Sequence, residues 1–311
     1  MGPTHSPAKF LPQITAKACE VNFLASTHID FPTRAAVESL AQKYLLPLPR
    51  EMRSPRPGEL TGRRTGSSVE YQDRKDFSPG DDLRHVDWRG FARSDRMTVK
   101  LYREEIMPRF NIIIDGSASM GVTPQKAVRR LEMAMLFWLM ARHLHGNVST
   151  WLANGSAPLR LETPLDIARH PDAETDAPLA AMAASPATRP GGISIVISDL
   201  LFPFDPGRLP TLFGQPDQLL VVQVLSAFEA NPGEGLQAGA MLRLQNAEAP
   251  EHLDVRLNSA TVEQYLRRLR ALQSDLADAL RRRGGAMATI RDVDDLDSAC
   301  RIMHTAGVLA L

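Results

Sequence analysis

Short β-branched apolar runs alternate with longer amphipathic stretches from residue 110 to the C-terminus. The runs 110–114 (Phe-Asn-Ile-Ile-Ile) and 193–198 (Ile-Ser-Ile-Val-Ile-Ser) are typical of strands buried inside a sheet. Apolar spacing predicts amphipathic helices over 124–145 and 259–283. Because strands that alternate with helices form layered sheets, we expect an α/β, Rossmann-like fold, an open and mostly parallel sheet with helices on both faces.

Local signals place the remaining elements. Thr123 can cap the first long helix, Pro124 suits its first position, and Gly146 can end it. Shorter stretches complete the pattern, with strands at 97–102, 147–153, 158–162, 218–225 and 286–290, a hairpin at 241–245 and 253–257, and helices at 33–44 and after Asp294.

The chain divides into three predicted regions. Residues 1–62 form an N-terminal extension with a short helix and a linker rich in Pro, Arg and Gly. Residues 63–105 are dense in charge and turn signals, and we expect them to pack on the core. Residues 106–311 form the α/β domain.

The overall composition argues against several classes of protein. Hydrophobic residues make up 43% of the 311, enough for a sizeable core. Lys plus Arg and Asp plus Glu both number 36, so the net charge gives no general attraction to nucleic acid. Cys19 and Cys300 form neither a disulfide framework nor a zinc motif, and the apolar run 134–141 is too short to span a membrane. We therefore expect a soluble, cytoplasmic protein.

Oxygen-bearing side chains follow the two predicted buried strands. Asp115 comes directly after the first run, and Asp199 directly after the second. Ser117 and Ser119 follow Asp115 at alternate positions. Ligands of open α/β sheets bind at the carboxyl ends of strands, and oxygen donors without His or Cys suit Mg²⁺ or Mn²⁺. The sequence therefore predicts a metal site at these four residues.

Other interpretations of the same loop are weaker. Asp115 and Ser117 could simply cap the next turn. The spacing from Gly116 to Gly121 imitates a phosphate-binding loop, but Val122 stands where that loop requires Lys. Ser117 lacks a Gly-x-Ser-x-Gly elbow and a nearby His, which argues against a nucleophilic hydrolase.

The Asp-x-Ser-x-Ser pattern at 115–119, together with Asp199, resembles the metal-ion-dependent adhesion site of von Willebrand factor A-like domains. The resemblance implies a further threonine ligand, for which Thr175 is the first candidate and Thr163 the second. It also implies an open, usually water-filled metal position that a carboxylate of a partner protein completes. Such a site binds its partner without a catalytic base.

A longer signature lies upstream of this loop. Residues 66–71 (Gly-Ser-Ser-Val-Glu-Tyr) and 79–93 (Pro-Gly-Asp-Asp-Leu-Arg-His-Val-Asp-Trp-Arg-Gly-Phe-Ala-Arg), with 222–229 downstream, resemble bacterial DUF58 proteins, a likeness that runs from about Arg63 to Ile290. The resemblance implies a von Willebrand factor A-like fold and a MoxR-type AAA+ ATPase as partner, in chaperone-like maturation of client proteins or insertion of their cofactors. Many relatives carry two membrane helices before the signature, and this chain resembles the subgroup without them.

Balanced charge marks the signature region, since residues 80–105 hold six acids and six bases. We interpret them chiefly as paired, partly buried ions that hold this region against the sheet. The alternative is a docking surface anchored by an aromatic residue and an arginine, because such residues dominate interfaces. The candidate docking residues are Asp81, Asp82, Arg84, Trp88 and Arg89.

The predicted function is a non-enzymatic, metal-dependent adaptor between the ATPase and a client. One alternative is an enzyme that uses Asp115, Asp199 and the metal to hydrolyse phosphoesters, a reaction that usually needs more carboxylates or a second ion. Another is a structural protein with a vestigial metal site. We expect no catalytic residues and no nucleic-acid partner.

Overall fold

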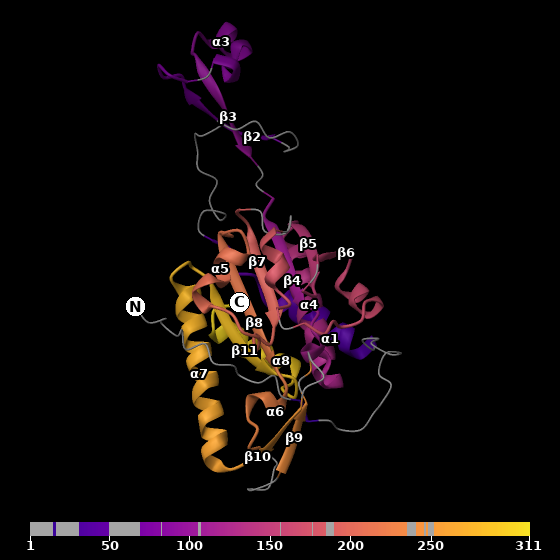
Figure 1. The fold of residues 1–311 in the computed structure, drawn as a ribbon. Helices are drawn as coiled ribbons and strands as arrows, with labels where there is room; N and C mark the ends of the chain where they lie inside the picture. The colour runs from indigo at the N-terminus through magenta and orange to yellow at the C-terminus, as the bar shows by residue number, and fades with distance from the viewer. Residues whose placement is uncertain are drawn as a thin grey trace, which may run out of the picture. The chain divides into compact units, whose positions relative to one another are not determined.

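A computed structural model gives the fold of the chain (Figure 1). It describes residues 15–16, 31–49, 69–81, 83–104, 107–155, 157–175, 177–184, 190–234, 241–245, 247 and 252–311. The chain forms two compact units. Met1–Pro47 and Arg109–Leu311 make up the sheet unit, and Leu48–Pro108 makes up the signature unit.

The sheet unit is built on six strands in the order β11-β8-β7-β4-β5-β6. They are β4 (Arg109–Asp115), β5 (Asn147–Ala153), β6 (Leu159–Leu161), β7 (Ile193–Ser198), β8 (Gln218–Leu225) and β11 (Ala286–Arg291). All neighbouring strands are parallel except β5 and β6. Residues 154–158 alone separate β5 from β6, too few for a parallel crossover, so β6 returns as an antiparallel edge strand.

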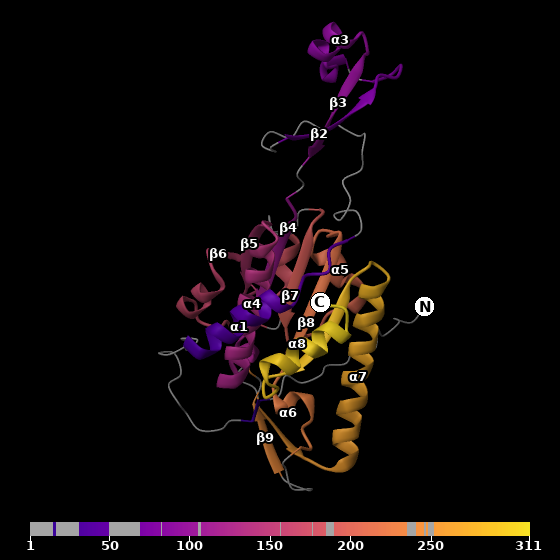
Figure 2. The same ribbon diagram turned by 180° about the vertical axis from the view of Figure 1, so that it is seen from behind.

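Helices lie on both faces of this sheet (Figures 1 and 2). They are α1 (Phe31–Lys43), α4 (Pro124–His143), α5 (Leu209–Leu212), α6 (Ala227–Ala230), α7 (Ser259–Arg281) and α8 (Leu296–Thr305). α4 and α8 lie on one face with α1 against both, and α5 and α7 lie on the other. On the α7 face, Ile113 and Val196 of the sheet pack with Phe213 and Leu276 in one buried cluster. The predicted α/β class, with a mostly parallel sheet, is confirmed.

The start of α4 agrees with the sequence prediction. Thr123 is its N-cap, with the hydroxyl oxygen accepting the Lys126 N–H at 3.0 Å, and Pro124 is in the first turn. The predicted apolar stripe is only partly right. Leu131 and Met135 are buried, whereas Val128, Trp138 and Leu139 are partly exposed. Because α4 lies between the sheet and α1, most of its circumference is buried and no single stripe describes it.

A second, three-stranded sheet belongs to the same unit, in the order β1-β9-β10. Its antiparallel strands are β1 (Thr15–Ala16), β9 (Met241–Gln245) and β10 (His252–Arg256). The predicted hairpin is confirmed. The short β1, which is distant from the hairpin in sequence, pairs antiparallel with the outer edge of β9.

The signature unit is a small hairpin with a helical connection. Its elements are β2 (Val69–Asp76), η1 (Leu83–His85), α3 (Trp88–Ser94) and β3 (Thr98–Glu104). β2 and β3 pair antiparallel, and Val86 forms an isolated bridge with Val99 of β3. Both valines are buried, so the connection folds back onto its own hairpin. The packing of this region on the α/β core stays a prediction.

Short 3₁₀ segments complete the described chain, namely η2 (Ala118–Gly121), η3 (Pro164–Arg169), η4 (Ala180–Ala184) and η6 (Pro206–Arg208). None of the helices in the described part of the chain combines the length and the apolar character that crossing a bilayer requires. Cys19, Asp82 and residues 50–62 of the predicted linker lie outside the described residues.

Candidate metal centre

Three neighbouring parallel strands each place a carboxylate at the same edge of the sheet. Asp115 is the last residue of β4, Asp199 directly follows β7, and Glu229 lies in α6, just after β8. The chain runs from β4 to β5 on one side and returns through β7 on the other, so the sheet reverses its order between β4 and β7. Such a switch point is where open α/β sheets bind ligands.

The loop after β4 gathers oxygen atoms around Asp115. Oδ1 of Asp115 accepts the Ser117 N–H at 2.9 Å and the Ser117 hydroxyl at 2.6 Å. Oδ2 accepts the hydroxyl of Ser198, and the Ser117 and Ser119 Oγ atoms are 3.0 Å apart. All four side chains are buried. The structure thus brings Asp115, Ser117 and Ser119 together.

Asp199 occupies a different setting, because it forms an ion pair. Nζ of Lys126 lies 2.9 Å from Asp199 Oδ2 and 2.8 Å from each carboxylate oxygen of Glu229. The second oxygen of Asp199, Oδ1, accepts the Leu201 N–H at 3.1 Å. Lys126 and Asp199 are completely buried. Both oxygens of Asp199 are therefore already engaged by the protein.

The carboxylates of this cluster outnumber its cation, which leaves two negative charges uncompensated when all three are ionised. Asp115, Asp199 and Glu229 carry three negative charges when ionised, against one positive charge on Lys126. Burial raises the pKa of Asp115 to about 7, the charge of Asp199 adds to that rise, and the Ser117 and Ser198 donors oppose it. Burial also raises the pKa of Glu229. A proton or another cation at Asp115 therefore stabilises the cluster.

The loop that carries Thr175 lies against the Asp115 loop. Ala173 pairs with Ser117 in a parallel bridge, and its backbone bonds to Gly116 and Ala118 measure 2.8 and 2.9 Å. Thr175 follows two residues later. An added Cβ on Gly155 would lie 2.3 Å from the Thr175 hydroxyl oxygen, so this glycine leaves room for the threonine.

Thr163 has a capping role instead. Its N–H donates to Asp166 Oδ2 at 2.8 Å, and its hydroxyl lies 3.2 Å from the same oxygen. These bonds form a capping box at the start of η3. The Thr175 hydroxyl oxygen accepts the Ala177 N–H at 3.3 Å. Which threonine completes the site stays a prediction, with Thr175 the first candidate and Thr163 the second.

The donors of the Asp115 loop fit a small divalent cation. Mg²⁺ takes oxygen ligands at about 2.0–2.1 Å in octahedral order, which places neighbouring ligand oxygens about 2.9 Å apart. The Ser117–Ser119 separation of 3.0 Å agrees with this value, and the Asp115–Ser117 separation is slightly shorter. Among the described residues there is no group of three His, Cys, Asp or Glu side chains that could hold a metal ion. A metal here would therefore depend on the serine hydroxyls.

Sequence reasoning missed Lys126, Glu229 and Ser198. A signal for Lys126 was available, because it lies four and seven residues before the buried Arg130 and Met133 on α4. A lysine at a core position of a helix implies a buried carboxylate partner. Arg130 also holds the site together, since its guanidinium donates to the Asp115 carbonyl oxygen at 3.1 Å and to Asp172.

The proposed docking residues lie in the signature unit. Asp81 forms a 2.6 Å pair with Lys75, and this bond lowers the pKa of the carboxyl group. Arg84 and Arg89 are exposed, and Trp88 is 54% exposed. Asp81 is thus paired and partly buried, with its side chain 18% exposed, whereas its partner Lys75 is 43% exposed. That such ions hold this region against the sheet stays a prediction.

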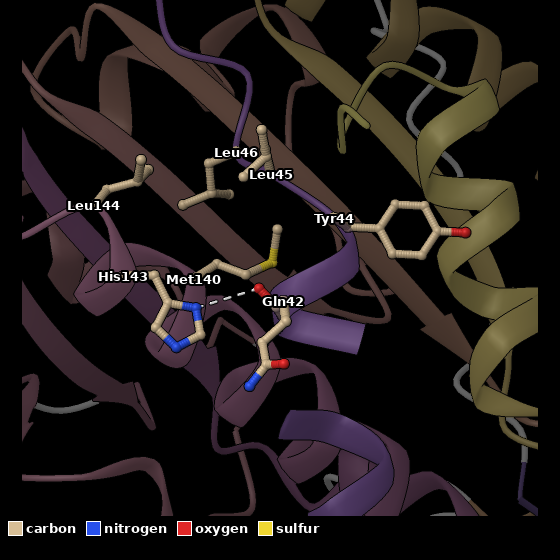
Figure 3. A pocket seen from close by; sticks show the side chains of 8 residues that line it. Gln42, Tyr44, Leu45, Leu46, Met140, His143 and Leu144 are labelled. Carbon is tan, nitrogen blue, oxygen red and sulfur yellow. Dashed lines mark hydrogen bonds between the residues drawn. The ribbon is translucent and has the colours of Figure 1, made fainter. Parts of the chain in front are cut away.

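A pocket of about 310 Å³ lies far from the Asp115 loop, between the ends of α1 and α4 (Figure 3). Apolar side chains such as Leu46 and Met140 dominate its lining, and His143 accompanies them. α4 starts beside the Asp115 loop and rises about 1.5 Å per residue, so its other end is almost 30 Å away. The pocket is not part of the strand-end cluster.

Fold and site together define an α/β protein with acidic and hydroxyl side chains at a sheet switch point. The chain belongs to the family described as "Protein of unknown function DUF58", whose model matches residues 73–275. No curated protein matches the chain. Among solved structures, it is similar to an aerotolerance-related membrane protein from Bacteroides fragilis, with 14% identity, a TM-score of 0.33, and coverage of 64% of this chain and 98% of that one.

Proposed function

We propose that this protein is a metal-dependent binding module of the von Willebrand factor A-like kind. Asp115, Ser117 and Ser119 hold Mg²⁺ or Mn²⁺, and a carboxylate of a partner protein completes the coordination. The supporting observation is a chain of close oxygen atoms at the end of β4. The Ser117 hydroxyl oxygen lies 2.6 Å from Asp115 Oδ1 and 3.0 Å from the Ser119 hydroxyl oxygen. The unpaired negative charge of the surrounding cluster favours a cation at this point.

Asp199 and Glu229 support the site without binding the metal directly. Lys126 holds both Asp199 and Glu229, so Asp199 acts through its charge, or through water, on a metal at Asp115. Thr175 is the proposed further ligand from the neighbouring loop. Bound there, the metal supplies a Lewis-acidic contact for an incoming carboxylate.

The partner is proposed from the family resemblance. We propose a MoxR-type AAA+ ATPase, with which this protein acts as an adaptor in the chaperone-like maturation of a client. The chain's belonging to DUF58 supports this choice. Binding rather than catalysis is favoured because the oxygens of Asp199 and Glu229 are engaged by Lys126 and by backbone N–H groups, which leaves neither as a ready general base.

The test has two stages, both with purified full-length protein. In the first, thermal unfolding is followed while Mg²⁺ is titrated. We expect the Tm to rise for the wild type and for the control Asp275→Ala, an exposed site on α7, but not for Asp115→Ala. An equal rise in Asp115→Ala would refute the metal site.

In the second stage, binding to a nucleotide-free MoxR-type ATPase from the same genome is measured with and without Mg²⁺. Wild type and Asp275→Ala should bind only with Mg²⁺, and Asp115→Ala should not bind. Equal affinity for the ATPase with and without Mg²⁺, and in wild type and Asp115→Ala, would contradict the adaptor proposal even if the first stage succeeds. Turnover of a phosphoester panel that vanishes in Asp115→Ala would favour the hydrolase instead.

A further inference from the structure

The inner face of α3 explains how the signature unit holds its helix. Asp87 is buried and caps the helix, with Oδ1 accepting the Gly90 N–H at 3.1 Å. A Cβ on Gly90 would lie 2.8 Å from Asp87 Oδ2, so only glycine lets the cap approach this closely. The buried Val86 anchors the preceding segment on Val99. None of these contacts uses the opposite side of the helix.

The outer face of α3 is exposed. Trp88, Arg89, Ala92 and Arg93 fall on one side at 3.6 residues per turn, and all four are exposed. Trp88 is 54% exposed, which leaves much of a large apolar side chain in water. Tryptophan is enriched among the residues that carry most of the binding energy of protein interfaces.

The charge of this surface has one dominant sign. Among the described residues from 83 to 96, the exposed charged side chains are Arg84, Arg89, Arg93, Arg96 and Asp95. This stretch therefore exposes four arginines and one carboxylate. Arg93 donates through Nε to the Arg89 carbonyl oxygen at 3.1 Å, which fixes its side chain along the helix.

We propose that this outer face, comprising Trp88, Arg89, Ala92 and Arg93 with the flanking Arg84 and Arg96, docks an acidic surface of a partner protein. Trp88 inserts into an apolar recess of the partner, and the arginines pair with surrounding carboxylates. This docking site lies in the signature unit and does not require the metal site in the sheet unit.

A protein fits this surface better than a nucleic acid does. Leu83, just before the helix, is 57% exposed, and with Trp88 and Ala92 it adds apolar area that a phosphate backbone does not cover. Asp95 repels phosphates, and the chain as a whole carries no net charge. Arginine with tryptophan is the composition of protein interface centres.

The experiment measures the binding of the full-length protein to a fluorescent glutamate-rich peptide that contains two leucines. The same peptide with glutamines in place of the glutamates is the comparison. We expect the acidic peptide to bind at least about tenfold more tightly, and the Trp88→Ala variant to lose about tenfold in affinity while Trp88→Phe keeps most of it.

Charge reversal gives the second measurement. The double variant Arg89→Glu, Arg93→Glu should weaken binding at least about tenfold. The matched control, Arg208→Glu with Arg267→Glu, changes two exposed arginines of the sheet unit by the same charge and should leave binding unchanged. Circular dichroism checks that each variant is folded.

Three results would overturn the proposal. The first is an equal loss of affinity in the control pair, which would show a general charge effect. The second is an unchanged affinity for the acidic peptide in Trp88→Ala, which would show that Trp88 does not contribute to binding. The third is tighter binding of a DNA duplex than of the acidic peptide, which would identify a nucleic-acid surface.

Discussion

Lys126 and Asp199 form an ion pair in the interior of the sheet unit, with 2.9 Å between Nζ and Oδ2 and neither side chain exposed. Glu229 is the second carboxylate on the same ammonium group. Each of the three side chains is tolerable in the core only because the others are present, since an isolated buried charge is strongly unfavourable.

Replacing Lys126 with methionine should therefore destabilise the protein. The variant leaves two buried carboxylates without their cation, and removing one partner of a buried pair typically costs about 3–5 kcal/mol in the free energy of unfolding. Denaturant unfolding measures the change. Adding Asp199→Asn and Glu229→Gln should recover part of the loss. The control Lys43→Met removes an exposed pair with Asp297 and should change little. Similar stability of Lys126→Met and Lys43→Met would contradict the role of the buried pair.

Stability without metal should depend on pH through Asp115. Its pKa rises in the folded protein from an ordinary value of about 3.9 to about 7, because burial disfavours the charged carboxylate. The folded state then holds more protons than the unfolded state between these values. The stabilisation is complete below pH 4 and is lost as the pH rises through 7.

The measurement is the free energy of unfolding in EDTA from pH 4 to pH 8, for wild type and Asp115→Asn. The difference, wild type minus variant, should fall as the pH rises. Added Mg²⁺ should offset the fall near pH 7, because a cation replaces the proton. A difference that stays flat across this range would argue against a protonated Asp115.

The two threonines should respond differently to alanine. Thr175→Ala should weaken Mg²⁺ binding, measured by the Mg²⁺-dependent rise in Tm, while Thr175→Ser preserves it. Thr163→Ala should cost about 1 kcal/mol of stability through its lost cap and leave Mg²⁺ binding intact. Weaker Mg²⁺ binding in Thr163→Ala alone would reverse the assignment.

Cys300 should be unreactive in the folded protein. It is completely buried in α8, and burial raises the pKa of its thiol to about 12, so hardly any thiolate exists at pH 8. Alkylation by iodoacetamide, followed on the peptide that contains Cys300, should proceed only as fast as the protein unfolds. Labelling in buffer at the rate seen in urea would show that α8 opens readily.

Strands were the most predictable part of the fold. The structural bounds of β5, β7 and β8 coincide with the predicted stretches. These strands are mostly apolar where they are buried, and turn residues such as Gly146 and Gly192 precede β5 and β7. Both the ends and the interior of such a strand are therefore encoded locally.

Helix ends and faces were less predictable. α4 ends at His143, and the left-handed residue that follows is His145 rather than the glycine. Its buried face includes charged residues, because the partners that make burial tolerable come from other elements. Lys126 and Glu229 are 103 residues apart in sequence, and nothing local to either one specifies the other. The grouping of Asp115, Ser117 and Ser119 could be predicted from the sequence because all three side chains lie within five consecutive residues.

The shared ammonium group also has an evolutionary consequence. Replacing Lys126 leaves two buried carboxylates without their cation at once. Such a substitution therefore lowers the stability of the protein until at least one of the two acids is replaced as well. Positions 126, 199 and 229 should accordingly be inherited as a set among related chains and vary in concert where they vary. Asp115 is linked to this set through the charge of Asp199, without sharing the ammonium group of Lys126, so its loop should vary less strictly in step with these three positions.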